Sequence, residues 1–475
     1  MSQAQQEAHQ PNPGVREEIH SPSPRPSTDI PAADLTTATA AQAPGSMEVT
    51  TRTDLSVLYR VLRAVIKPLR PRLVRPKGAA QPTGSPRLSP PRKRDVEITE
   101  MQCEEGVWMY RFRAAPGKGP GSRSVGKDKA AVDGGVGRRD GQTNTTRHQH
   151  HRVYYFCGGG FQSPPAPEHW RFLAQLTHDL ASHHHSNEPD VDDSHDLHHP
   201  DTETEIEPVL VSYPLAPTNP ASASLRILRH WLKKVMDEAV EGGETLSLMG
   251  DSSGGNVVLS LGFWAAQEYV FTPPSEQQQG QQRAGPPVAD DPTKTNRANG
   301  TTTTTTQSTS PFPLRSLISI SPPTDLTNSN PDIRKADKLD PVLTAGFTRE
   351  VAEVWTTGKK HPQKKPSAHH EPLPLADPSV SPLLQPDVAF HALKDRGVNV
   401  HGVVGTHDVL APDAIEFLRK CKGLGVRGRW LVWEGQMHCF PLAGGAPGLG
   451  IREGTEAREF LARVLRRDCV REEYK

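Results

Sequence analysis

The feature that most constrains this chain is a regular alternation of strand-like and helix-like segments. Branched and aromatic residues mark strands at 152–156, 206–212, 245–249, 314–320, 398–405 and 428–434. Apolar residues at three- and four-residue spacing mark helices at 168–181, 222–239, 255–269, 412–423 and 451–466. Such alternation is typical of βαβ units, so we expect an α/β fold whose mostly parallel central sheet has helices on both faces. Functional residues of such sheets lie just past the carboxyl ends of the strands.

Four polar, low-complexity segments interrupt this pattern, at about 115–150, 183–205, 273–311 and 358–376. Pro and Gly together make up 85 of the 475 residues and only 34% of residues are apolar, so we expect these segments to be disordered insertions in loops. Without them about 257 residues remain between 97 and 470, a normal size for one domain. We therefore expect a single interrupted domain over 96–470, which begins with two strands around 104–106.

Residues 1–95 differ from the rest of the chain. Residues 1 to about 52 are polar and show no periodicity, which favours disorder. Residues 54–67 have apolar side chains at helical spacing among basic ones, with Asp54 as a candidate N-cap and Pro68 beyond the end, which predicts an amphipathic helix. Eleven Lys and Arg and no acidic residue occur from 55 to 94, a pattern that allows peripheral contact with an anionic membrane. The alternative is a helix packed on the domain and followed by a solvated linker.

Several classes of protein do not fit the composition. The 55 basic and 55 acidic side chains balance, so charge gives no argument for a nucleic-acid partner. No run of 18 apolar residues exists, and the first residues lack the pattern of a secretory signal. The five cysteines include no C-x-x-C pair, which favours free thiols in a reducing compartment. We therefore expect an intracellular, cytoplasmic protein.

The segment 245–256 carries the first candidate for catalysis. A strand runs into G-x-S-x-G, with Ser252 between Gly250 and Gly254, and then into a helix. In a turn this tight the middle residue is strained and its side chain projects outward, while the N–H groups that follow face an anion at the helix N-terminus. The alternative is a Gly-rich turn without chemistry. Ser253 is the neighbouring candidate, but only Ser252 has Gly at both −2 and +2.

A serine nucleophile needs a base, and the base needs an orienting carboxylate. Asp408 follows the strand at 398–405, and His438 follows the strand at 428–434. Both residues therefore fall on the sheet edge expected for Ser252, in the chain order Ser, Asp, His that this kind of sheet requires. A single Asp or His in a loop is more often merely solvated. Three such residues at three strand ends favour a catalytic triad.

A run of glycines at 158–160 follows the strand at 152–156. Consecutive glycines let backbone N–H groups approach a tetrahedral oxyanion without a clash from Cβ. With the N–H of Ser253 they would form an oxyanion hole. The alternative, a flexible linker, is disfavoured by the aromatic residues on both sides.

These motifs together resemble the hormone-sensitive-lipase-like esterases of the α/β-hydrolase fold (the fold-3 group), especially fungal members. The resemblance covers about 152–442 and rests on G-D-S-S-G-G-N at 250–256, Y-P-L-A-P at 213–217, S-P-P-T-D-L at 321–326, D-P-S-V-S-P-L at 377–383, G-T-H-D at 405–408 and G-Q-M-H-C-F at 435–440. Two positions depart from the family pattern. Cys157 stands where the family usually has His before the glycines, and Pro214 stands second in the Y-x-L-A-P motif. The departure at Cys157 puts the geometry of the glycine loop in question.

The resemblance implies a carboxylic-ester hydrolase. Ser252 would be the nucleophile, His438 the general base and then acid, and Asp408 the orienting carboxylate. The N–H groups of Gly158, Gly159 and Ser253 would form the oxyanion hole. It implies no metal and no organic cofactor, and a small-molecule ester as the substrate. Residues 54–67 and 335–357 would form the lid and the pocket walls.

Other functions remain open at this point. A hydrolase-fold binding protein or receptor typically lacks one member of the triad, whereas this chain has all three. An amide hydrolase or an acyltransferase would use the same three residues, so the triad cannot distinguish these reactions from ester hydrolysis.

Overall fold

The structure is a computed structural model. It describes residues 46–70, 81–92, 95–115, 149–182, 204–271, 311–359, 371–445 and 450–469. The four low-complexity insertions and residues 1–45 fall largely or entirely outside these ranges.

The centre of the molecule is a nine-stranded sheet in the order β1-β9-β8-β7-β6-β4-β5-β3-β2. The strands are β1 (Met47–Arg52), β2 (Val96–Gln102), β3 (Trp108–Ala114), β4 (Gln149–Phe156), β5 (Thr204–Ser212), β6 (Thr245–Asp251), β7 (Leu314–Ile320), β8 (Asn399–His407) and β9 (Gly428–Met437). In this order all neighbouring strands from β1 to β5 run parallel, and β3 is antiparallel to both of its neighbours, β5 and β2. The expected mostly parallel α/β sheet is confirmed.

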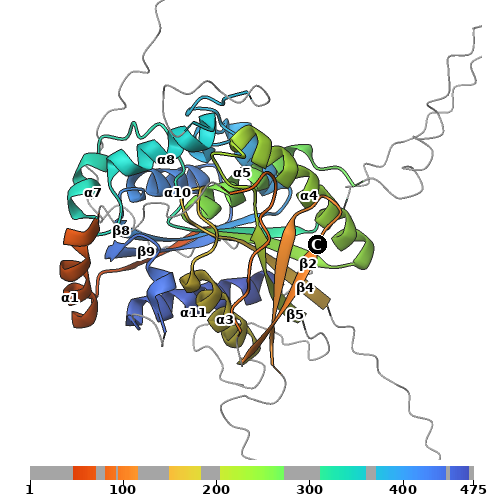
Figure 1. Cartoon of the computed structure of the whole chain (residues 1–475), viewed down its shortest axis with the longest axis horizontal. Coiled ribbons are helices and arrows are strands. Elements are labelled where there is room, and N and C mark those ends of the chain that lie inside the picture. The colour runs from red at the N-terminus through yellow and green to blue at the C-terminus, as the bar shows by residue number, and fades with distance from the viewer. Residues whose placement is uncertain are drawn as a thin grey trace, which may run out of the picture.

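Helices cover both faces of the sheet, as Figure 1 shows. The helices are α1 (Val57–Ile66), α3 (Pro167–Ser182), α4 (Ala221–Gly242), α5 (Ser253–Glu268), α7 (Ile333–Leu339), α8 (Ala345–Thr357), α9 (Asp387–Asp395), α10 (Ala411–Gly423) and α11 (Arg452–Cys469). The short 3-10 helices are η2 (Lys67–Leu69), η4 (Pro382–Leu384) and η5 (Phe440–Ala443). One apolar core lies under α4, α5, α8, α9 and α10, and a second lies under α1, α3 and α11.

The strands contribute side chains to both cores because successive side chains of a strand point to opposite faces of the sheet. In β4, Tyr154 and Phe156 pack into the first core, whereas Val153 and Tyr155 pack into the second. The central strands are buried on both faces, which explains why they read as nearly continuous apolar runs.

The N-terminal region differs from the expectation in two ways. Residues 1 to about 52 were expected to be disordered, but Met47–Arg52 forms β1, which pairs with β9 and covers that edge of the sheet. Only Met47 of this strand is fully buried, so the strand depends on its pairing with β9 rather than on a strong apolar pattern of its own.

The amphipathic helix forms as α1, but Asp54 is not its N-cap. The Ser56 hydroxyl accepts the N–H of Tyr59 and caps the helix. The Asp54 carboxylate instead pairs with Arg52 and Arg452. Within the described residues, no helix is long and apolar enough to cross a membrane.

Candidate active site

Ser252 lies in the tight turn between β6 and α5. Its backbone has φ 50° and ψ −124°, a strained conformation for a residue with a side chain. The turn needs Gly at 254, because a Cβ there would overlap the backbone of Phe156. The strand, the strained turn and the helix thus present the hydroxyl of Ser252 at the carboxyl edge of the sheet.

His438 and Asp408 meet Ser252 at this edge, although they lie far away in the sequence. The Nε2 atom of His438 lies 3.0 Å from Ser252 Oγ, and its Nδ1 atom lies 2.8 Å from Asp408 Oδ2. The other oxygen of Asp408 accepts the N–H of Leu410 at 2.9 Å, which fixes the orientation of the carboxylate. A carboxylate can only accept, so Nδ1 carries the proton and Nε2 presents its lone pair to the hydroxyl.

The electrostatics of this group suit a general base. Burial disfavours a charged His438, but Asp408 stabilises the imidazolium, and the pKa of His438 lies well above its ordinary value of 6.5. Asp408 is completely buried, so water does not screen its interaction with the ring. A raised pKa makes the neutral ring a stronger base, but the ring is protonated, and therefore inactive, at pH values below that pKa.

The glycine loop only partly matches the expectation. Gly158 was expected to offer its N–H to an oxyanion, but this N–H donates to Asp251 Oδ1 at 2.9 Å. Within the described part of the chain, the N–H groups of Gly159 and Ser253 have no acceptor. Gly159 has φ 131°, a conformation that favours glycine. Gly158 therefore anchors the loop, while Gly159 and Ser253 keep N–H groups that can bind an anion.

Asp251 is a functional residue that the sequence analysis did not single out. Its buried carboxylate accepts the hydroxyl of Tyr155 at 2.7 Å as well as the N–H of Gly158, and its other oxygen lies 3.3 Å from Nε2 of His169. Burial opposes the charge on Asp251, but contact with His169, Tyr155 and Gly158 lowers its pKa overall. Asp251 thus ties the glycine loop to the turn that holds the neighbouring Ser252.

His169, from α3, contacts the Asp251 carboxylate that anchors the glycine loop. The backbone N–H of Ala166 donates to Nδ1 of His169 at 2.9 Å, so this nitrogen accepts and Nε2–H donates to Asp251. Cys157 is buried, and burial together with Asp251 raises the pKa of its thiol well above the ordinary value. Cys157 is therefore a packing residue in the loop and not a nucleophile.

Two further side chains lie beside the triad. Asp340, between α7 and α8, accepts the N–H of Val409 at 2.8 Å, next to the orienting carboxylate Asp408. Burial and the charge of Asp408 raise the pKa of Asp340 to about 6. The thiol of Cys439 lies 3.4 Å from Nε2 of His438, and burial raises its pKa to about 11, so it stays protonated at neutral pH. Cys439 falls inside the G-Q-M-H-C-F motif, but no local pattern in the sequence marked Asp340.

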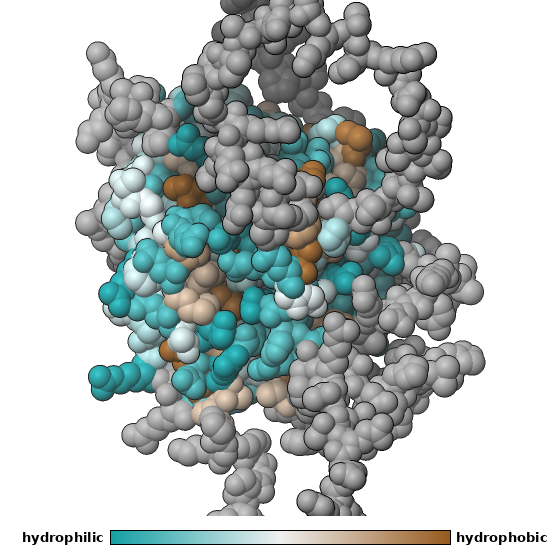
Figure 2. Space-filling view, turned by 90° about the vertical axis from the view of Figure 1, so that its right-hand side faces the viewer, coloured by the Kyte–Doolittle hydropathy of each residue, from teal (hydrophilic) through white to brown (hydrophobic). Residues whose placement is uncertain are grey.

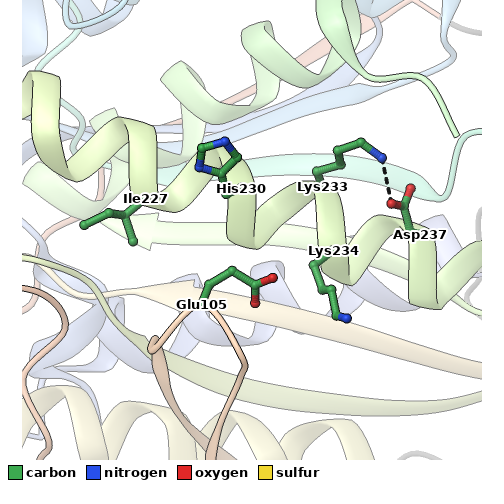
Figure 3. A pocket seen from close by; sticks show the side chains of 6 residues that line it. All are labelled: Glu105, Ile227, His230, Lys233, Lys234 and Asp237. Carbon is green, nitrogen blue, oxygen red and sulfur yellow. Dashed lines mark hydrogen bonds and ion pairs between the residues drawn. The ribbon is translucent and has the colours of Figure 1, made fainter. Parts of the chain in front are cut away.

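A hollow of about 510 Å³ lies elsewhere on the surface and is unrelated to the triad (Figure 3). It lies between α4 and the turn that joins β2 to β3, and is lined by Glu105, Ile227, His230, Lys233, Lys234 and Asp237. Lys233 pairs with Asp237 at 2.7 Å, and Lys234 pairs with Glu104 at 3.0 Å. Both lysines of this open hollow are therefore paired, Lys233 within the lining and Lys234 with Glu104 beside it.

Comparisons with known proteins agree with this architecture. A family model described as alpha/beta hydrolase fold matches residues 201–442, just over half of the chain, a stretch that includes Ser252, Asp408 and His438. No curated protein matches the chain.

Solved structures show the same fold. Carboxyl esterase 2 from the mycorrhizal fungus Tuber melanosporum is 14% identical, with a TM-score of 0.52, over 88% of this chain and 100% of that protein. EstE5, in a crystal soaked with ethyl alcohol, is 17% identical, with a TM-score of 0.51, over the same shares of 88% and 100%. An esterase/lipase from an uncultured bacterium is 17% identical, with a TM-score of 0.50, again over 88% and 100%. At these identities the likeness shows the fold alone.

Proposed function

This chain belongs to the alpha/beta hydrolase fold-3 family, and from that premise we propose that it hydrolyses carboxylic esters through an acyl-enzyme. The observation that carries the proposal is the chain of contacts from Asp408 through His438 to Ser252, at 2.8 Å and 3.0 Å. Such a chain makes an ordinary serine nucleophilic. That Tuber melanosporum carboxyl esterase 2 shares the fold supports the same class of reaction.

In the first half of the proposed reaction, Ser252 Oγ attacks the ester carbonyl carbon while His438 Nε2 takes the hydroxyl proton. The carbonyl oxygen becomes an oxyanion, which the N–H groups of Gly159 and Ser253 would bind. The intermediate then collapses, and the alcohol leaves with the proton that His438 returns. The acyl group stays on Ser252. Asp408 keeps the ring in the correct tautomer and stabilises its positive charge in both transition states.

In the second half, a water molecule replaces the alcohol. His438 takes a proton from the water as its oxygen attacks the acyl carbon, and a second oxyanion forms in the same place. Collapse releases the carboxylic acid and returns the proton from His438 to Ser252. The cycle therefore consumes one ester and one water and needs no redox partner.

The proposal is tested with p-nitrophenyl esters of graded acyl length. The wild-type protein should release p-nitrophenol, and Ser252→Ala should not. Ser260→Ala is the matched control, because Ser260 is buried in the same helix and its hydroxyl has no partner among the described residues. Equal turnover by wild type and Ser252→Ala would end the proposal. The corresponding p-nitroanilide should react far more slowly, and a faster amide than ester would reassign the protein as an amidase.

A further inference from the structure

The outer face of α1 carries an exposed apolar strip. Eight large apolar side chains are exposed among the described residues, and five of them lie between 57 and 69. The members of the strip, in order along the helix and η2, are Val57, Leu58, Val61, Val65 and Leu69. The four-residue steps from 57 to 69 place these side chains on one face. Val57 is 76% exposed and Val65 is 60% exposed, so the strip faces solvent rather than the core.

The opposite face of the same helix is fixed to the domain. Tyr59 is fully buried, and its hydroxyl donates to the carbonyl of Gly435 at 2.8 Å. Leu62 and Ile66 pack against the second core. The guanidinium of Arg63 donates to Nδ1 of His407 at 2.7 Å, next to the proposed orienting carboxylate Asp408. The helix α1 is therefore anchored to β9 and β8, close to the triad. Its apolar strip faces away from these contacts.

Positive charge flanks the strip. Arg60 and Lys67 are exposed on the side of the helix next to it, and α1 contains no acidic residue. The Lys67 ammonium donates to the backbone carbonyl of Lys338 at 2.8 Å, so a further basic residue of α7 lies close by. The neighbouring Leu339 is also exposed. Figure 1 shows α1 and α7 side by side at one end of the molecule.

We propose that this face of α1 docks onto the surface of an anionic phospholipid bilayer. A helix that lies in a membrane interface buries an apolar strip at the level of the acyl chains, and its cations meet the lipid phosphates beside it. A second copy of this chain is a poorer occupant, because a symmetric contact would bring the like charges of Arg60 and Lys67 together. The arrangement thus favours a partner that is both apolar and negatively charged.

Figure 2 provides a contrast on the same molecule. It shows the side at the right of Figure 1, where the visible surface is mainly hydrophilic and hydrophobic residues form small separate patches. Isolated exposed valines, such as Val270 and Val388, are ordinary on a protein surface. The concentration of apolar residues on α1 is what sets that face apart.

The test is sedimentation of the full-length protein with phosphatidylcholine vesicles that contain or lack 30 mol% phosphatidylserine, roughly the anionic fraction that gives a strong surface potential. We expect binding to the anionic vesicles and little to the neutral ones. The double variant Val61→Ser, Val65→Ser should lower the partition coefficient roughly tenfold or more, because it removes apolar area from the interface. Arg60→Gln with Lys67→Gln should lower it about fivefold for each charge.

Matched controls separate this proposal from general damage and from the proposed catalysis. Val270→Ser with Val388→Ser makes the same change at exposed valines elsewhere and should leave binding unchanged. Ser252→Ala should bind vesicles like the wild type, so the docking can stand even if the catalytic proposal fails. Absence of binding to anionic vesicles, or equal binding by the Val61/Val65 double variant, would overturn the proposal. A wild-type dimer that this double variant converts to monomer would instead assign the strip to a second copy of the chain.

Discussion

Two His–Asp pairs lie beside the turn that holds Ser252, and the two histidines contact their aspartates through different ring nitrogens. In the first, His438 donates Nδ1–H to Asp408 and turns a free Nε2 lone pair toward Ser252. In the second, His169 accepts the N–H of Ala166 at Nδ1 and donates Nε2–H to Asp251. Both rings are almost fully buried.

The difference teaches that a carboxylate partner does not by itself make a histidine a base. The two pairs differ in what the second ring nitrogen meets. For His438 it is a hydroxyl that can give up its proton to the ring, whereas for His169 it is a backbone N–H that keeps its proton. The first pair can therefore move a proton, and the second can only hold the glycine loop in place through Asp251.

The most direct test of the different roles of His438 and His169 is to replace each of them by alanine in turn. We expect His438→Ala to lower kcat for p-nitrophenyl butyrate on the order of 10⁶-fold, because the nucleophile loses its base. His169→Ala should lower kcat by only about tenfold, through a displaced loop. Steady-state kinetics on both variants checks the pair of values, and equal losses would show that the two histidines do not have separate roles.

A second test changes a carboxylate rather than a ring. Asp408→Asn should lower kcat about 10⁴-fold, because the amide favours the tautomer that puts a proton on Nε2. Asp468→Asn is the matched control, since Asp468 pairs with His401 at 2.9 Å at the other end of β8. That variant should keep the wild-type kcat. A normal rate for Asp408→Asn would mean that this carboxylate does not orient the base.

A third test asks whether the pair His169–Asp251 stabilises the fold and holds the glycine loop. His169→Ala should also lower the free energy of unfolding by about 3 kcal/mol, because the buried Asp251 carboxylate loses the donor to its second oxygen. His169→Gln keeps an N–H donor and should recover both stability and kcat. Urea unfolding at neutral pH, read together with kcat, checks this. If Gln failed to restore the rate while restoring stability, the link between Asp251 and the loop would be wrong.

The smallest expected effect is on the pH profile. Because the pKa of His438 is raised, the neutral base is lost as pH falls, and the acid limb of kcat/KM should have its midpoint above 6.5. Without the charge of Asp408 that midpoint should move down by roughly one to three pH units in Asp408→Asn. An unchanged midpoint in this variant would assign the limb to another group.

The sequence predicted the parts of the molecule that depend on local pattern. Ser252 sits in a glycine turn that is readable from five residues, and Asp408 and His438 each follow a strongly apolar strand. The alternation of strands and helices was equally local, and it predicted the parallel sheet.

What could not be predicted depends on contacts between distant segments. His169 reads as one polar residue at the start of an amphipathic helix, and its partner Asp251 lies 82 residues away. The N–H of Gly158 is occupied by the same distant carboxylate, that of Asp251, so its role could not be predicted from the glycine run alone. In the same way, β1 is stable only because β9 offers it an edge.

The central claim, that Ser252 is the nucleophile activated by His438, is tested most directly by covalent labelling with diethyl p-nitrophenyl phosphate. Attack by the active serine expels p-nitrophenolate and leaves a diethyl phosphoryl group, which peptide mass spectrometry locates. We predict one label per chain, on Ser252, and a strongly reduced labelling rate in His438→Ala. A label on Ser253 or Cys439, or rapid labelling of Ser252 without His438, would contradict the account.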